Sequence, residues 1–256
     1  MNQLLQPLSL LGLACLALVS CGKPAPENLR FEVISTRTHD PDAFTQGLEL
    51  SNGRLFESTG QYGESTLREL DPATGKVLRK RPLAKNVFGE GLTHFGKELF
   101  VLTWKEKTAY VFEPDTFKLI RSHPYEGEGW GLTNDGSSLI MSDGSSDLKF
   151  INPRDFTVQK TLTVKDGNAP VSKLNELEFI DGEIYANIFM TEKIARISPS
   201  DGRVTAWLDL TGLRNQLPKP NRAEVLNGIT HDPATGHLLV TGKYWPLMFE
   251  IKLTHK

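Results

Sequence analysis

Beyond residue 21 this sequence contains no cysteine. Its two cysteines, Cys15 and Cys21, both lie near the start of the 256-residue chain. The rest of the chain can therefore form no disulfide bond, and it offers no thiol nucleophile and no cysteine ligand for a metal ion. A domain built from these residues has to be stabilised by the burial of apolar side chains.

The chain also lacks an excess of either charge. It has 29 Lys and Arg against 31 Asp and Glu, which gives a formal net charge of −2. Proteins that bind nucleic acids concentrate positive charge along one face. We therefore expect no nucleic-acid partner.

Several motifs that identify catalytic or metal centres are missing. The six histidines show no His-x-His or HExxH spacing, and there is no glycine-rich phosphate loop and no GxSxG sequence. The sequence therefore predicts no metal at a catalytic site and no cofactor. It leaves room for a structural calcium ion, held by main-chain carbonyls or by Asp143 and Asp147.

The long apolar run of the chain lies at its amino terminus, from Leu4 to Val19. A run this short that ends in small residues indicates a secretory signal peptide rather than a membrane-spanning helix. Its last residues, LVSC at 18–21, resemble the lipobox of bacterial lipoproteins, although the preceding MNQLLQPL has no Lys or Arg. We predict a signal peptide over residues 1–20, cleaved before a lipidated Cys21, and a tether over 21–28. The alternative is a cleaved signal without a lipid.

This amino terminus predicts an exported protein on the periplasmic side of a bacterial membrane. As a lipoprotein it would contact the membrane only through its lipid anchor, and without the lipid it would be soluble in the periplasm. We expect a monomer.

A hairpin pattern recurs five times along the chain. Its copies begin at Gly47, Gly91, Gly131, Glu176 and Gly228, with spacings of 40 to 52 residues, the range of a four-stranded propeller blade. The first four contain a turn that favours positive φ, such as Asn52-Gly53 or Asp181-Gly182. The repeats predict an all-β fold, a five-bladed β-propeller formed by residues 29–256.

Each of the first four copies is followed by a second hairpin with a proline turn, and these prolines are Pro72, Pro114, Pro153 and Pro199. The fifth copy has only a third strand, in MFEIKL at 248–253, before the chain ends. We expect RFEVIST, from Arg30, to supply the missing fourth strand and close the ring. A short helix is predicted within the long connection, at 213–217.

At two sets of equivalent positions the five copies carry different residue types, whereas positions that only support the fold should carry similar ones. Before the first strands stand four polar residues and one aromatic residue: Gln46, Glu90, Trp130, Asn175 and Asn227. After the second strands stand Gly60, Trp104, Gly144, Phe189 and Lys243. Both sets should meet at one mouth of the central channel. A carboxylate, amides, an ammonium group and aromatic side chains gathered at one place are typical of a site for a small polar ligand.

Each of these residues also has a structural interpretation. The two tryptophans could plug the channel, Asn175 and Asn227 could cap strand ends, and Lys243 alone would be an ordinary surface charge. His94 and His231 occupy equivalent positions in two of the repeats, and we interpret both as turn residues. The joint placement of the two sets, with Glu90 between two glycines, favours a functional site.

The sequence resembles the plant-type glutaminyl cyclases, a family also found in bacteria. The resemblance rests on segments spread in order along the chain: FTQGL from Phe44, FGEGLT from Phe88, LTW from Leu102, EGWGLT from Glu128, LNELEF from Leu174, ARIS from Ala195, LNGI from Leu226 and TGKYWP from Thr241. It implies a five-bladed propeller and a metal-independent glutaminyl-peptide cyclotransferase. Such an acyltransferase converts the N-terminal Gln of peptides and proteins to pyroglutamate and releases ammonia.

The resemblance also implies roles for individual residues. Glu90 would be the general acid and base. Gln46, Asn175 and Lys243 would hold the carbonyl and amine of the substrate, and Phe44, Phe88, Trp104 and Trp130 would form a hydrophobic enclosure. Phe189 stands where the family pattern has a tryptophan, which puts affinity in question more than activity. The resemblance gives Asn227 no role.

Two other classes remain as alternatives. A metal-dependent propeller lactonase would place several acidic ligands around the channel, whereas this set contains one carboxylate. A non-catalytic propeller lipoprotein of the cell envelope would use the same fold to bind a protein partner, and the residues at the channel mouth do not exclude it.

Overall fold

Strands form nearly all the regular structure in residues 24–254, the part of the chain that the computed structural model describes. The fold is all-β, as the sequence predicts. The predicted signal peptide and Cys21 lie outside the described residues. Within those residues no helix is both long and apolar enough to cross a bilayer.

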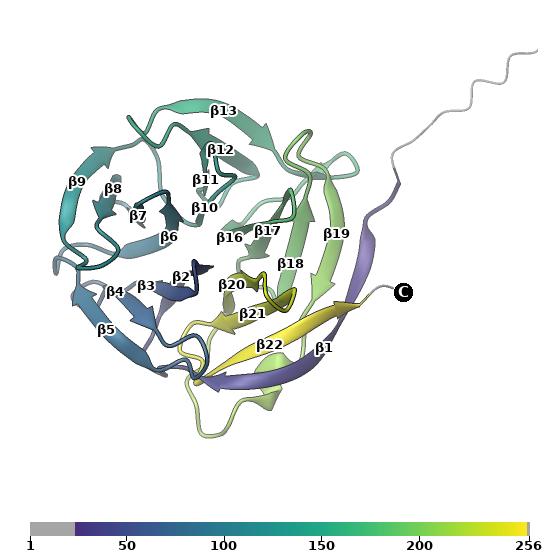
Figure 1. The fold of residues 1–256 in the computed structure, drawn as a ribbon. Helices are drawn as coiled ribbons and strands as arrows, with labels where there is room; N and C mark the ends of the chain where they lie inside the picture. Colours follow the sequence, from purple (N-terminus) through teal and green to yellow (C-terminus); the bar gives the residue numbers. More distant parts are fainter. Residues whose placement is uncertain (1–23, 255–256) are drawn as a thin grey trace, which may run out of the picture.

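Three sheets each contain four antiparallel strands in chain order, and they follow one another around a common centre (Figure 1). The first consists of β2 (Thr45–Ser51), β3 (Arg54–Thr59), β4 (Thr66–Leu70) and β5 (Val77–Pro82). The second consists of β6 (Gly89–Phe95), β7 (Glu98–Thr103), β8 (Thr108–Phe112) and β9 (Leu119–Pro124). The third consists of β10 (Leu132–Asn134), β11 (Leu139–Ser142), β12 (Asp147–Ile151) and β13 (Val158–Thr163).

The ring is completed by an eight-stranded sheet with the order β16-β17-β18-β19-β1-β22-β21-β20. One half consists of β16 (Leu174–Ile180), β17 (Glu183–Ile188), β18 (Lys193–Ile197) and β19 (Val204–Asp209). The other half consists of β20 (Leu226–Asp232), β21 (His237–Gly242), β22 (Leu247–Thr254) and the amino-terminal β1 (Glu27–Thr38). A hairpin of β14 (Lys165–Asp166) and β15 (Ala169–Pro170) precedes β16.

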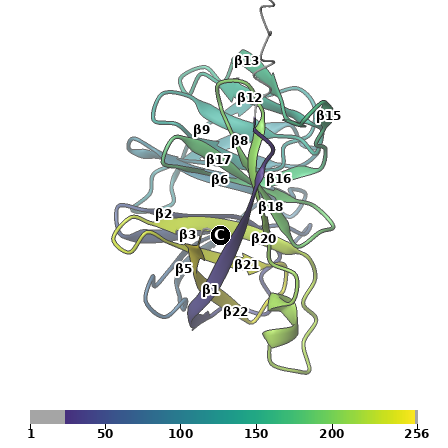
Figure 2. The same cartoon turned by 90° about the vertical axis from the view of Figure 1, so that its right-hand side faces the viewer.

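Strand β1 joins the two halves of this sheet. It pairs in parallel with β19 over Glu27–Leu29 and then antiparallel with β22 over Arg30–Thr38. Figures 1 and 2 show it running along the outside of the ring beside β22. The predicted pairing of the segment from Arg30 with the carboxy-terminal strand is therefore confirmed. The edge that β22 would otherwise expose is covered.

The turns between the paired strands have the backbone conformation that the sequence predicts. Asn52 and Gly53 both have positive φ, at 52° and 74°, and so do Asp181 and Gly182, at 50° and 85°. These values suit two-residue hairpins, whose twist matches that of the flanking strands. The predicted short helix is also present, as the 3₁₀-helix η1 (Leu213–Gln216).

The apolar core lies between neighbouring sheets rather than within one of them. Phe56 and Leu67 of the first sheet pack with Leu99 of the second, and similar clusters join each sheet to the next. The last cluster closes the ring, because Met248 of β22 packs against Leu48 of β2. Stability is thus spread around the whole ring, without a cysteine in the described residues.

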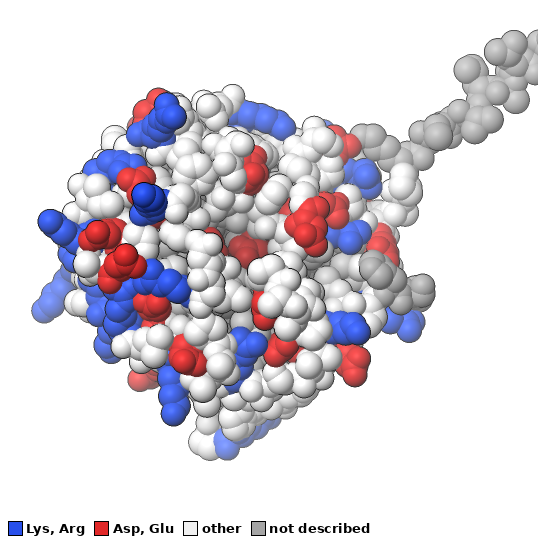
Figure 3. All heavy atoms as spheres, in the orientation of Figure 1, with Lys and Arg blue, Asp and Glu red and all other residues white. Residues whose placement is uncertain are grey.

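The outer surface carries both charges. Figure 3 shows Lys and Arg interspersed with Asp and Glu over the face that it draws, in keeping with the net charge of −2. Acidic side chains lie in the hollow near the centre of that face and at one side of it. This face presents no continuous basic surface.

Candidate active site

Four innermost strands carry a β-bulge where a polar side chain was predicted to face the channel. The register of β2 shifts around Gln46, and that of β6 shifts around Glu90. The same shift occurs around Asn175 in β16 and Asn227 in β20. A bulge leaves a residue out of the ladder and re-aims its side chain. These residues are the second residue of each strand, so they lie within the strands and not before them as expected.

The second set follows the neighbouring strands directly. Trp104, Phe189 and Lys243 are the first residues after β7, β17 and β21. Most members of the two sets meet in a cavity of about 260 Å³, lined by Phe44, Gln46, Gln61, Phe88, Glu90, Trp104, Trp130, Asn175, Phe189 and Lys243. Every predicted catalytic and substrate-binding residue lines this cavity. The roles assigned to them stay predictions.

Glu90 and Lys243 are the buried charges of the cavity. Within residues 24–254 burial and neighbouring charges act on the pKa of either group, and no hydrogen bond does. Burial raises the pKa of Glu90 well above its usual value, against the nearby positive charge of Lys243. Burial also lowers the pKa of Lys243 to about 8, although the charge of Glu90 opposes this. Burial thus shifts both groups toward their neutral forms, and perturbed groups of this kind in a cavity are typical of functional sites.

Aromatic rings form the wall of the cavity. Phe44 meets Phe88 edge-on at 5.9 Å between centroids, and Phe88 meets Trp104 at 5.5 Å. On the other side Trp130 meets Phe189 edge-on at 5.5 Å. The Nζ atom of Lys243 lies 4.4 Å from the ring centroid of Phe44 and 5.2 Å from that of Phe189. Phe189 thus makes ring contacts within this wall.

The two glycines of the second set leave room for this wall. A Cβ atom on Gly60 would lie 2.3 Å from the Phe88 ring, and one on Gly144 would lie 2.7 Å from Trp130. Gly144 also has a φ of +80°, which L side chains rarely adopt. Glycine at these positions is therefore required by the neighbouring aromatic side chains.

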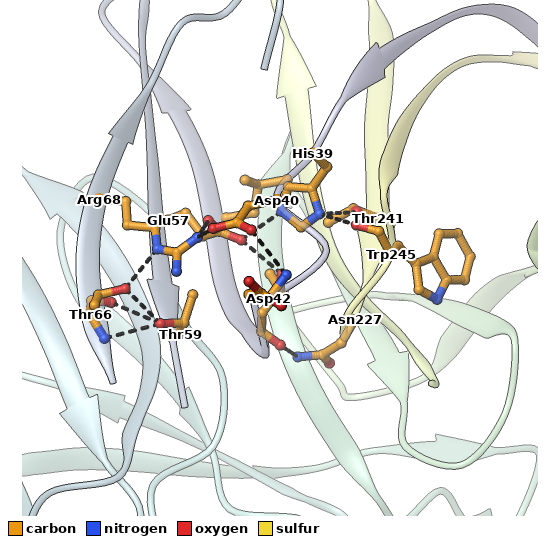
Figure 4. Close-up of polar contacts among 12 residues, drawn as sticks. His39, Asp40, Asp42, Glu57, Thr59, Thr66, Arg68, Asn227, Thr241 and Trp245 are labelled. Atoms are coloured by element: carbon orange, nitrogen blue, oxygen red, sulfur yellow. Dashed lines mark hydrogen bonds and ion pairs between the residues drawn. The ribbon is translucent and has the colours of Figure 1, made fainter. Parts of the chain in front are cut away.

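A buried charge network fixes the segment that carries Phe44 and Gln46 (Figure 4). The Nε2 atom of His39 lies 2.8 Å from Glu57 Oε1, and its Nδ1 lies 2.7 Å from the carbonyl oxygen of Trp245. Thr45 Oγ1 donates to the same Glu57 oxygen at 2.8 Å, and Arg68 bonds Asp40 at 2.9 Å. The segment between His39 and Thr45 is therefore held at both ends.

Each ring nitrogen of His39 faces an acceptor oxygen, an arrangement that favours a proton on both nitrogens. Burial acts to lower the pKa of His39, but the charge and hydrogen bond of Glu57 outweigh it, and the pKa is raised. Burial likewise acts to raise the pKa of Glu57, and the charges of His39 and Arg68 lower it. Both shifts favour the ionised pair, and Arg68 lies 3.5 Å from Glu57 Oε2, the oxygen that accepts no hydrogen bond in the described chain.

Asn227 lies behind the cavity rather than in its lining. Its Nδ2 donates to Gln46 Oε1 at 3.2 Å and to the carbonyl oxygen of Thr45 at 2.9 Å. Because Asn227 occupies the oxygen of the Gln46 amide, the NH₂ group of Gln46 is left to face a ligand. Asn227 thus orients a cavity residue, which neither the repeat pattern nor the resemblance indicated.

Gln61, His94 and His231 differ from the sequence-based interpretation, whereas the structural calcium ion stays a prediction. Gln61 lines the cavity with a φ of 90°, and its position after Gly60 was the available signal. His94 and His231 are not turn residues, since they lie within β6 and β20, where the strand continues for one more residue. Asp143 is paired with Lys149 at 2.9 Å. In residues 24–254 no three His, Cys, Asp or Glu side chains are grouped so as to hold a metal ion.

Comparison with known proteins places the chain in a family. Residues 7–253 match the family described as glutamine cyclotransferase. The chain is 42% identical over 228 residues to glutaminyl-peptide cyclotransferase of Arabidopsis thaliana, which covers 87% of this chain and 71% of that protein. The crystal structure of Myxococcus xanthus glutaminyl cyclase matches with a TM-score of 0.84 and 36% identity, over 90% of this chain and 99% of that one. The chain belongs to the glutamine cyclotransferase family.

Proposed function

We propose that this protein is a glutaminyl-peptide cyclotransferase, which converts the N-terminal Gln of peptides and proteins to pyroglutamate with release of ammonia, and that Glu90 is its general acid and base. The family and the activity named for its relatives support the reaction. The observation that carries the assignment of Glu90 is a buried carboxyl group that lines the cavity and whose pKa is raised by burial, with no hydrogen bond from the described residues among the causes.

The reaction needs two proton transfers at neighbouring nitrogens. The α-amine of the substrate attacks the γ-carboxamide carbon, and the new C–N bond leaves a positive charge on that amine. Glu90 accepts this proton and then donates it to the amide nitrogen, whose bond to carbon breaks as ammonia leaves. A carboxylate can perform both steps when its pKa lies near the working pH, and burial moves the pKa of Glu90 in that direction.

The remaining cavity residues bind and orient the substrate. The NH₂ group of Gln46 and the ammonium of Lys243 are donors for the γ-carbonyl oxygen, which becomes an oxyanion in the tetrahedral intermediate. Asn175 Oδ1 is buried and has no partner in the described chain, so it can accept a hydrogen bond from the substrate amine. The walls formed by Phe44, Phe88, Trp104, Trp130 and Phe189 exclude water and hold the Gln side chain folded for cyclisation.

The number of blades, the oligomeric state and the cellular location of the protein are also part of what we propose. We count each half of the eight-stranded sheet as one blade, which gives a five-bladed propeller closed by β1. We propose a monomer without a catalytic cofactor, exported to the periplasmic side of a bacterial membrane and anchored there by a lipid on Cys21. The LVSC segment supports the lipid anchor.

The test is ammonia release from a peptide that begins with Gln. We expect turnover with this peptide and none with the matched peptide that begins with Asn, which would have to close a strained four-membered ring. Mass spectrometry should show a loss of 17 Da, the mass of ammonia. A protein that binds the Gln peptide and releases no ammonia would be a binding protein, and the proposal would be wrong.

A further inference from the structure

One carboxylate outside the cavity lining contacts both of its tryptophans. Glu128 Oε2 accepts a hydrogen bond from Trp104 Nε1 at 2.7 Å and a second from Trp130 Nε1 at 3.1 Å. The two indoles come from different sheets, since Trp104 follows β7 of the second and Trp130 precedes β10 of the third. Glu128 therefore links two sides of the cavity through a single atom.

The loop that carries Glu128 is shaped to bring it there. Gly127 has a φ of +90°, which favours glycine. A Cβ atom on Gly129 would lie 2.2 Å from the hydroxyl of Tyr125 and 3.0 Å from the carbonyl oxygen of Thr103. The amide of Gly129 donates to the carbonyl oxygen of Trp104 at 3.2 Å. The two glycines thus let the loop lie against the end of β7, with Glu128 between the indoles.

Glu128 also closes a gap in the aromatic wall. The ring contacts described above run from Trp104 through Phe88 to Phe44, and from Phe189 to Trp130, with Lys243 between Phe44 and Phe189. Between Trp104 and Trp130 no ring contact is present in the described residues. The two hydrogen bonds to Glu128 supply the connection there.

We propose that Glu128 is a positioning residue for cyclisation, which holds the indoles of Trp104 and Trp130 in the orientation that encloses the substrate side chain. This inference rests on the proposed function of the cavity. An indole N–H that is partly buried requires an acceptor, and an ionised carboxylate is a strong one. Without Glu128 both N–H groups lose their acceptor, and the ring contacts with Phe88 and Phe189 restrain the two indoles less firmly.

The charge of Glu128 has a second effect on the same site. Burial is the largest cause that raises the pKa of Glu90, Lys243 opposes it, and the charges of Glu128 and Glu106 raise it further. Tyr62 and Tyr125 also interact with Glu90, and both are neutral at the pH of the reaction. Removing the charge of Glu128 should therefore lower the pKa of Glu90. The limb of the pH–rate profile that reports Glu90 should then move to lower pH.

The loop offers a matched control for these effects. Glu126 lies two residues away, with 98% of its side chain exposed, and it pairs with Lys107 at 3.6 Å. Glu126→Gln removes the same charge from the same loop without touching an indole. We expect it to leave kcat and KM within about twofold of the wild-type values, because exposed pairs contribute little.

The test compares Glu128→Gln with that control. We expect Glu128→Gln to raise KM for a Gln-initiated peptide about tenfold, because hydrogen bonds to a charged acceptor are lost at the cavity wall. We expect Glu128→Ala to raise it further, at an unchanged midpoint of thermal unfolding. The pH–rate limb should move down in both variants. A Glu128→Gln enzyme that matches Glu126→Gln in KM and pH profile would overturn the inference.

A double-mutant cycle separates positioning from a general effect of charge. Phenylalanine at 104 and 130 keeps an aromatic wall but has no N–H group. In the Trp104→Phe/Trp130→Phe background, Glu128→Gln should therefore raise KM less than about twofold. An undiminished effect in that background would show that Glu128 does not act through the indoles, and the inference would be wrong.

A measurement without turnover keeps this inference apart from the proposed function. In a Trp207→Phe background, we expect Glu128→Gln to increase acrylamide quenching of tryptophan fluorescence, since Trp245 is fully buried and Trp104 and Trp130 line the cavity. Unchanged quenching would contradict the positioning role. If the wild-type protein releases no ammonia but Glu128→Gln still changes the quenching, the proposed function is wrong. The inference that Glu128 positions the two indoles is then still supported.

Discussion

The two ends of the innermost strands both hold buried carboxyl groups, and they use them differently. At one end Glu90 lines the cavity, and no hydrogen bond from residues 24–254 contributes to the shift of its pKa. At the other end a second hollow, of about 250 Å³, is lined by Glu49, Glu178, His94, His231 and neighbouring residues. An extended strand rises about 3.3 Å per residue, so the four residues from Glu90 to His94 separate these ends by about 13 Å.

The carboxyl groups toward the second hollow are satisfied by main-chain amides. Glu49 accepts from the amide of His94, and Glu178 from that of His231. Glu176, in the middle of β16, accepts from Leu48 at 3.2 Å and from Ile229 at 2.9 Å, and so ties β16 to β2 and β20. Burial raises the pKa of Glu176, as it does that of Glu90. The shift alone therefore does not distinguish a structural from a catalytic carboxyl group; the hydrogen-bond partners do.

Removing β1 should open the ring and destabilise the whole domain, including both ends of the inner strands. Deletion of residues 28–37 removes most of β1 and exposes the edge of β22, and we expect a loss of several kcal/mol, in order of magnitude, from the lost burial. Chemical denaturation measures it. Deletion of residues 24–26, which precede β1, is the control and should leave the midpoint unchanged. Equal midpoints for the two deletions would contradict the closing role of β1.

Glu90→Gln should affect catalysis at the cavity and leave the stability of the domain nearly unchanged. The variant keeps size and hydrogen-bonding capacity but cannot transfer a proton, so we expect kcat to fall by at least about a hundredfold. KM and the unfolding midpoint should change far less. Ammonia release under saturating substrate measures kcat. A turnover within about threefold of wild type would make Glu90 a binding residue only.

Glu176→Gln should show the opposite pattern. The NH₂ group of the new amide faces one of the two main-chain amides that Glu176 now accepts from, so a buried N–H loses its partner. We expect a loss of about 1–3 kcal/mol in the free energy of unfolding, with kcat of the folded fraction within about threefold of wild type. A stable variant that lost kcat as Glu90→Gln does would remove the distinction between the two carboxyl groups.

The pH dependence of stability should reflect the ionisation of Glu49, which lines the second hollow. Burial raises the pKa of Glu49 from 4.5 to about 7, while hydrogen bonds from Thr93 and His94 oppose the shift. Because the folded pKa is above the unfolded one, Glu49 contributes stability below pH 4.5 that is lost as pH rises to about 7. Denaturation at several pH values should show this decline in wild type. In Glu49→Gln, which cannot ionise, the decline should be shallower.

The smallest expected effect concerns the support of the cavity. Asn227→Ala removes the donor that holds Gln46 Oε1, and the net loss of such a bond is about 1 kcal/mol. We therefore expect kcat/KM to fall about fivefold, chiefly through KM. Steady-state kinetics with the Gln peptide measure this change. A kcat/KM equal to that of wild type would show that Gln46 keeps its orientation without Asn227.

Much of the cavity could be predicted from the sequence because its residues occupy equivalent positions of a repeat. A residue at the start of an inner strand lies near the centre of the ring, so Gln46, Glu90 and Asn175 could be grouped without coordinates, whereas the equivalent Asn227 lies behind the cavity. Their position within β-bulges could not be predicted, because a bulge depends on the register of two strands. The expectation that they precede the strands was wrong for this reason.

The sequence by itself determined the all-β class, the five repeated hairpins, the pairing of β1 with β22 and seven of the residues that line the cavity: Gln46, Glu90, Trp104, Trp130, Asn175, Phe189 and Lys243. These follow from periodicity, turn chemistry and repeat position, all of which are local. Only the tertiary structure decided that Glu128 bonds two indoles, that Asn227 orients Gln46 and that Glu176 is satisfied while Glu90 is not. These properties depend on partners from different sheets, as far apart in the chain as Gln46 and Asn227, and only the closed ring brings such groups within hydrogen-bonding distance.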